Sequence, residues 1–161
     1  MVGGGTPRPW VLSRHQLHLL WELRPCISFP MPALTSAAFD DKMVLDIGEA
    51  IIIETRAYNN DGRVGFDLYE SSFSYFSFQS PTINTFKDPR WGRDRECPSE
   101  DPFHAQNFVR AMLSGLEDDF TRYNRVIATC KHYAANDFGN YEGTERYGFD
   151  AIVTTQELSE Y

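Results

Sequence analysis

The spacing of apolar residues predicts a helix that begins near Asp40 or Asp41 and stops near 59–62. Its apolar positions recur every three to four residues, so they share one face of a helix. These positions are Val44, Ile47, Ile51 and Tyr58. Asp40 or Asp41 can cap the start of this helix with a carboxylate. The cluster of turn-forming residues at 59–62 predicts its end.

A second helix is predicted to begin at Asp101-Pro102, where an N-cap carboxylate precedes a proline at the first helical position. Its expected buried stripe consists of Phe108, Met112, Leu113 and Leu116. Further along, Thr154 and Glu157 have the spacing of a capping box, which predicts the start of one more helix.

Three short segments have the composition of β-strands. The range 27–32 is bounded by prolines, as an edge strand can be, and the ranges 64–69 and 126–130 are candidate buried strands. Strands therefore alternate with helices along the chain. Such alternation predicts an α/β fold with parallel strands and helical crossovers.

The range 70–80 interrupts this alternation. It is rich in Ser, Phe and Tyr, and a segment of this kind is prone to form β-structure. Its aromatic cluster consists of Phe73, Tyr75, Phe76 and Phe78. Its composition differs from that of its surroundings, so this range is anomalous in the alternating pattern.

Charge and cysteine content exclude several classes of protein. The net charge of −8 and the pI near 4.9 argue against a nucleic-acid or anionic-membrane partner, since both require a basic face. Three widely separated cysteines do not form a disulfide framework. The apolar run at 17–21 is too short for a signal peptide or a membrane span, so no signal peptide is visible.

Candidate chemistry lies in two segments, Lys87–Arg93 and the pair Lys131-His132. Each follows a predicted strand, and loops at the C-terminal ends of parallel strands share one rim of an α/β barrel. We therefore expect Arg93, Lys131 and His132 to line one pocket that donates hydrogen bonds to a neutral polyhydroxyl ligand.

Other interpretations of these residues stay open. The range 87–101 is densely charged, and its side chains could simply pair with one another. No metal site is expected, because Cys130 and His132 have no further ligand at useful spacing. Glu96, Glu100 and Asp101 could be the paired carboxylates of a glycosidase, but Glu100 and Asp101 are adjacent at a helix start, where capping accounts for them better.

These segments together resemble the N-terminal barrel domain of glycoside hydrolase family 3, and within it the fungal exo-β-xylosidases. The resemblance rests on eight segments: 29–32, 37–41, 81–84, 87–93, 99–103, 128–135, 149–151 and 158–161. The Asp-Pro-Arg-Trp-Gly-Arg segment at 88–93 is the most specific of them, and Lys131-His132 strengthens it.

The resemblance implies an incomplete parallel (β/α)8 TIM-type barrel of roughly two to three βα units. Residues 27–161 would form this partial barrel domain, with 70–80 inserted, and residues 1–26 would lie outside the match. The implied function is retaining hydrolysis that releases terminal xylose from xylo-oligosaccharides, by a secreted enzyme without metal or cofactor. Alternatives are a β-glucosidase of the same family and a sugar-binding domain without catalysis.

In that family Arg93, Lys131 and His132 would hydrogen-bond the hydroxyls of the sugar in the −1 subsite. The nucleophile and the general acid/base would lie downstream of Tyr161, so we expect the isolated chain to be inactive. A carboxylate that the family carries in its first barrel loop would precede Phe29, and nothing in 1–26 matches it.

Overall fold

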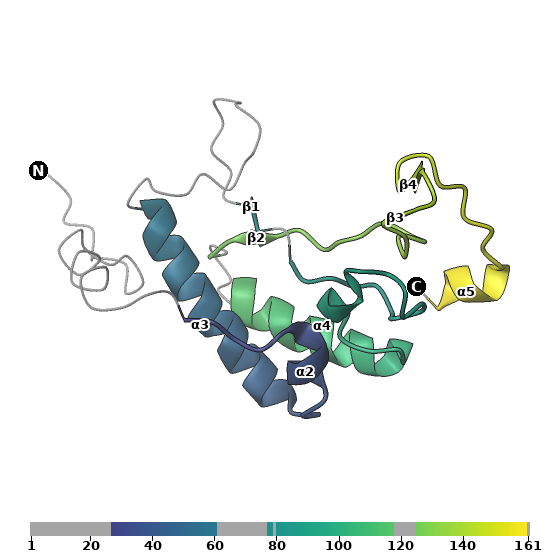
Figure 1. Ribbon diagram of the computed structural model, residues 1–161. Coiled ribbons are helices and arrows are strands. Elements are labelled where there is room, and N and C mark those ends of the chain that lie inside the picture. Colours follow the sequence, from purple (N-terminus) through teal and green to yellow (C-terminus); the bar gives the residue numbers. More distant parts are fainter. Residues whose placement is uncertain (1–26, 61–76, 79, 118–124, 161) are drawn as a thin grey trace, which may run out of the picture.

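The computed structural model describes residues 27–60, 77–78, 80–117 and 125–160, which Figure 1 shows in colour. The predicted strand at 64–69, the range 1–26 and residues 70–76 lie outside the described residues. The elements follow in this order: α2 (Pro32–Ser36), α3 (Asp41–Asn60), β1 (Ser77–Phe78), the 3₁₀ turn η1 (Asp94–Glu96), α4 (Pro102–Glu117), β2 (Ile127–Ala128), β3 (Asn140–Tyr141), β4 (Thr144–Glu145) and α5 (Thr155–Ser159).

Both predicted long helices, α3 and α4, are confirmed together with their caps. The Asp40 carboxylate accepts a hydrogen bond of 3.0 Å from the N–H of Met43 in the first turn of α3. The Asp101 carboxylate accepts one of 3.0 Å from the N–H of Phe103 in the first turn of α4. These caps satisfy backbone donors that have no partner within a helix.

Helices α3 and α4 pack against each other and enclose the core (Figure 1). They approach closely at Gly48 and Gly115, where a Cβ on Gly115 would overlap the Leu45 carbonyl oxygen. The buried cluster contains Val44, Ile47, Ile52, Phe108, Met112, Leu116 and Val126. The predicted stripes are largely correct, although Ile52 is fully buried while Ile51 is only partly buried.

A parallel strand pair lies above the helices in Figure 1. β1 pairs with β2 in the register Ser77 to Ile127 and Phe78 to Ala128. Parallel pairing agrees with the predicted α/β class, and β2 confirms the centre of the strand expected at 126–130. β1 belongs to the range 70–80, so the end of that range takes part in the sheet.

The prediction of a strand at 27–32 is wrong. Residues 27–31 have no regular structure, and the short helix α2 begins at Pro32. Proline fits the first turn of a helix, because its fixed φ suits helical geometry and its missing N–H would have no intrahelical partner. The apolar residues near these prolines therefore precede a helix, and no strand of the described ranges pairs with them.

The C-terminal part extends away from the two long helices (Figure 1). β3 and β4 form an antiparallel hairpin whose turn residues Glu142 and Gly143 both have positive φ, 47° and 83°. This geometry is typical of a tight hairpin turn. The capping box at the start of α5 is confirmed, since Thr154 and Glu157 hydrogen-bond each other's backbone N–H.

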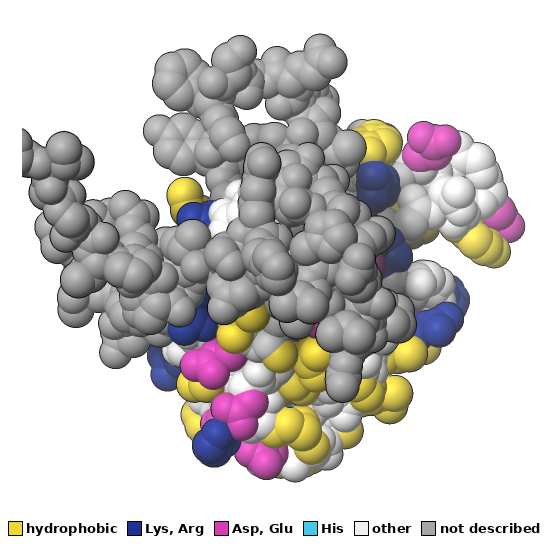
Figure 2. All heavy atoms as spheres, turned by 90° about the vertical axis from the view of Figure 1, so that its left-hand side faces the viewer, with side chains coloured by type: hydrophobic (Ala, Val, Ile, Leu, Met, Phe, Trp, Pro, Cys, Tyr) yellow, Lys and Arg dark blue, Asp and Glu magenta, His cyan; other side chains and the backbone are white. Residues whose placement is uncertain are grey.

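The surface of the described part mixes polar and apolar side chains. Figure 2 shows apolar side chains lying between acidic and basic ones on the lower part of one face. Among the described residues, no helix is both long enough and apolar enough to cross a membrane.

Candidate functional site

Backbone pairing beyond β1 and β2 brings the two candidate segments together. Thr82 forms a parallel bridge with Lys131, flanked by hydrogen bonds from Ile83 N–H to the Lys131 carbonyl (2.6 Å) and from Lys131 N–H to the Pro81 carbonyl (3.1 Å). The chain then continues toward Arg93 on one side and into His132 on the other. The two candidate segments therefore meet at one edge of this parallel pairing, and 77–82 is the described segment that leads toward the Arg93 loop.

The loop that carries Arg93 is anchored by buried residues on both sides. Trp91 is 4% exposed and Cys97 is 1% exposed. Between them, η1 places Glu96 three residues after Arg93, with backbone hydrogen bonds from Glu96 N–H to the Arg93 carbonyl and from Cys97 N–H to the Asp94 carbonyl. A short turn held at both ends gives its side chains a defined direction.

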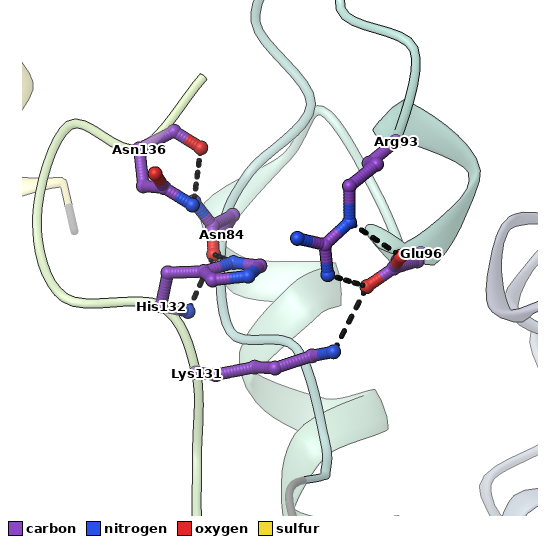
Figure 3. A network of polar contacts seen from close by, with 6 residues as sticks. All are labelled: Asn84, Arg93, Glu96, Lys131, His132 and Asn136. Atoms are coloured by element: carbon purple, nitrogen blue, oxygen red, sulfur yellow. Dashed lines mark hydrogen bonds and ion pairs between the residues drawn. The ribbon is translucent and has the colours of Figure 1, made fainter. Parts of the chain in front are cut away.

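Arg93, Glu96 and Lys131 form a charged triad (Figure 3). Arg93 donates from Nε and Nη2 to the two oxygens of Glu96, each at 2.8 Å. Lys131 Nζ lies 3.0 Å from Glu96 Oε2. The hydrogen bonds from Arg93, and then those from Lys131, lower the pKa of Glu96 to about 2. Glu96 is therefore a carboxylate at neutral pH, and the triad carries one net positive charge.

His132 is held by the buried side chain of Asn84. Asn84 Oδ1 accepts a hydrogen bond from the His132 N–H at 2.8 Å and lies 3.2 Å from His132 Nδ1, while Asn84 Nδ2 donates to the Asn136 carbonyl at 3.3 Å. Since an amide oxygen only accepts hydrogen bonds, this contact assigns the ring proton to Nδ1. Burial, followed by the charges of Arg93 and Lys131, lowers the pKa of His132.

A cavity of about 590 Å³ opens beside these side chains, and Arg93, Lys131 and His132 all line it. Figure 3 shows the third guanidinium nitrogen of Arg93 pointing toward His132, away from Glu96. Trp91 meets the His132 ring edge-on, with 6.1 Å between the ring centroids. The three predicted residues therefore lie at one site, where cationic donors stand beside a neutral imidazole.

The other predicted candidates have different roles. Glu100 and Asp101 are exposed, and Asp101 caps α4, as expected. Within the described ranges, no group of three or more His, Cys, Asp or Glu residues is arranged to hold a metal ion. Glu96 was grouped with these carboxylates in the sequence, but it lies inside the site as the partner of both cations.

Sequence reasoning missed the roles of Asn84 and Glu96. Asn84 is 0% exposed, and a buried amide needs hydrogen-bond partners that a sequence does not reveal. The spacing of Arg93 and Glu96 was a signal for their pairing, since oppositely charged residues three apart meet on a helical turn. The contact from Glu96 to Lys131 joins residues 35 apart in the sequence and had no such signal.

Comparisons with known proteins identify relatives of this chain. No profile of a known protein family matches the chain. The probable exo-1,4-β-xylosidases of Aspergillus flavus and Aspergillus oryzae are each 47% identical to it over 135 residues, and the exo-1,4-β-xylosidase of Emericella nidulans is 40% identical over 134 residues. Each match covers 83% of this chain and 16% of the relative.

A solved structure agrees as well. The GH3 exo-β-xylosidase XlnD, in complex with a xylobiose aziridine activity-based probe, matches with a TM-score of 0.68 and 35% identity. The match covers 83% of this chain and 16% of that one, so the chain spans about a sixth of the proteins it matches. Sequence identity and structural similarity thus relate the chain to the glycoside hydrolases. More narrowly, it is homologous to one segment of the family 3 exo-β-xylosidases, which confirms the resemblance found in the sequence.

Proposed function

We propose that this chain supplies the xylose-binding part of an exo-acting, retaining β-xylosidase that releases terminal xylose from xylo-oligosaccharides. The observation that carries the proposal is the convergence of Arg93, Lys131 and His132 in a segment that is 47% identical to exo-1,4-β-xylosidases. We further propose that residues 27–161 form two to three βα units of a (β/α)8 barrel and that the protein acts outside the cell, as the resemblance implies.

The chemistry of the three side chains suits the hydroxyls of a neutral sugar. Arg93 and Lys131 are charged donors, and charge-assisted hydrogen bonds are stronger than neutral ones. Hydrolysis of a glycoside passes through an oxocarbenium-like state in which the ring flattens. Donors that tighten on the hydroxyls in that state would stabilise it more than they stabilise the ground state.

The reacting carboxylates are proposed to be residues other than Glu96. A general acid must be protonated near the working pH, whereas Glu96 has a pKa of about 2. Both of its oxygens already accept hydrogen bonds from Arg93. The same observation favours a second candidate function, in which the described site binds a sugar without cleaving it.

Titration of the 161-residue chain with methyl β-D-xyloside, followed by NMR, tests the proposal. Lys131→Met and Arg93→Ala each remove charge-assisted hydrogen bonds, so we expect each to weaken binding by about tenfold or more. Lys42→Met removes an exposed lysine of α3 and serves as the matched control, with affinity unchanged. A wild-type chain that does not bind the xyloside, or variants that bind as well as wild type, would contradict the proposal.

Two further measurements on the same sample separate the alternatives. Tighter binding of methyl β-D-glucoside than of the xyloside would favour a β-glucosidase. Release of nitrophenol from an aryl β-xyloside would show that the chain itself catalyses hydrolysis, whereas binding without turnover fits a sugar-binding part of a longer catalytic unit.

A further inference from the structure

We propose that Glu96 is a positioning residue, which holds Arg93 and Lys131 in the one arrangement that presents both donors to the sugar. The inference rests on the proposed function, because it assigns Glu96 a role in the same site. It differs from the sequence-based interpretation, in which Glu96 was one of several charged residues near a helix start.

The first step is the geometry of Arg93. A guanidinium is planar, so two hydrogen bonds from Nε and Nη2 to one carboxylate fix the plane of the whole group. The direction of the third nitrogen, Nη1, is then determined. Figure 3 shows that this nitrogen points toward His132. Both residues line the same cavity, together with Lys131.

The second step concerns Lys131, whose ammonium sits at the end of a flexible four-carbon stem. Its Nζ lies 3.0 Å from Glu96 Oε2, the same oxygen that accepts from Arg93 Nη2. The side chains of Arg93 and Lys131 are 38% and 29% exposed, so solvent is open to both. Without the carboxylate, two like charges would repel each other and the flexible lysine would turn toward water.

The third step is that Glu96 itself is well anchored. It ends the 3₁₀ turn η1, its own N–H donates to the Arg93 carbonyl, and the next residue, Cys97, is 1% exposed. A carboxylate on such a turn can impose its position on a long, flexible partner. Glu96 therefore orders the two cations, and the proposed sugar site uses an arrangement that is formed before the ligand arrives.

Three substitutions test this role in the 161-residue chain. Glu96→Gln keeps the shape and removes the charge, and we expect roughly tenfold weaker binding of methyl β-D-xyloside. Glu96→Asp keeps the charge and should recover part of that loss. Glu100→Gln removes an exposed carboxylate a few residues away and should leave affinity unchanged.

A double-mutant comparison distinguishes positioning from a general structural effect. If Glu96 acts through Lys131, Glu96→Gln should weaken binding less in a Lys131→Met background than in the wild type. Equal losses in both backgrounds, wild-type affinity in Glu96→Gln, or a Glu96→Asp variant no better than Glu96→Gln would each overturn the inference.

One signal in the unsubstituted chain is independent of sugar binding and of the folding of any variant. The Arg93 Nε–H should give a separate proton resonance protected from solvent exchange, because it donates to Glu96 at 2.8 Å. Rapid exchange of this proton would overturn the positioning role. A protected proton in a chain that does not bind the xyloside would show that the proposed function is wrong although the ion pairing is present.

Discussion

Asn84 connects two loops of the site through a single buried side chain. Its oxygen accepts from the backbone of His132, and its amide nitrogen donates to the carbonyl of Asn136 and lies 3.5 Å from Asp137. Burial raises the pKa of Asp137. A polar group that is 0% exposed can be tolerated only when such partners satisfy it. Asn84 is therefore a support of the site even though it does not line the cavity.

Replacing Asn84 should destabilise the folded chain strongly. Asn84→Ala removes the hydrogen bonds to the His132 N–H and the Asn136 carbonyl, and we expect a loss of about 2–3 kcal/mol. Asn84→Asp keeps the acceptor but sets a second carboxylate beside Asp137, so it should be no better than Ala. Urea unfolding measures the stability of both variants. Asn140→Ala, at an exposed position, is the control, and its unfolding free energy should stay within about 0.5 kcal/mol of wild type. An Asn84→Asp variant that loses much less unfolding free energy than Asn84→Ala would contradict this account.

The triad predicts a dependence of stability on acid pH. The pKa of Glu96 falls from 4.5 to about 2 in the folded chain, so the unfolded chain binds more protons between these values. The stabilisation by Glu96 is complete above pH 4.5 and is lost as the pH falls toward 2. Because Glu96 is 36% exposed, solvent limits this stabilisation to about 1 kcal/mol. The difference in unfolding free energy between wild type and Glu96→Gln should shrink over this range, and a constant difference would contradict the assignment.

At the scale of elements, the features that sequence predicts best are those that are local. The caps Asp40 and Asp101 and the capping box at Thr154 follow from neighbouring residues alone, and all three are confirmed. The proline-bounded segment at 27–32 was wrong because a strand needs a partner, which the segment itself does not specify. The close approach of Gly48 and Gly115 also escaped prediction, since it depends on where two helices cross.

That crossing can be tested by adding one methyl group. Gly115→Ala improves helix propensity, yet its Cβ would overlap the Leu45 carbonyl, so we expect a net loss of about 1–3 kcal/mol. Gly48→Ala should cost less, because its nearest contacts are 3.0–3.2 Å. The exposed Ser114→Ala on the same helix is the control and should be neutral or slightly stabilising. A Gly115→Ala variant as stable as Ser114→Ala would show that the helices can separate freely.

At the scale of the whole molecule, sequence predicted which segments meet but not how they hold one another. Arg93 and Lys131-His132 meet at one edge of the parallel pairing, as expected, because parallel strands end at the same edge. The partner of β2 was not predictable, since Ser77–Phe78 lies in a range that the family resemblance marked as an insertion. Pairing across about fifty residues depends on the assembled fold, and composition within a short window does not report it.

The described residues also divide into a packed part and an exposed part, which predicts unequal protection of backbone amides. The core cluster draws on α3, α4 and Val126, whereas the residues of β3 and β4 are exposed and α5 has no buried residue. Local opening requires the least free energy where few apolar contacts must be broken.

Hydrogen exchange followed by NMR should therefore find the slowest amides in the middle of α3 and α4, and fast exchange in β3, β4 and α5. Gly115→Ala provides an internal control, because it should accelerate exchange in the two long helices without affecting the hairpin. Slow exchange of β3 and β4 equal to that of α3 and α4 would contradict the division. It would mean that the hairpin is held by contacts as cooperative as those of the helical core.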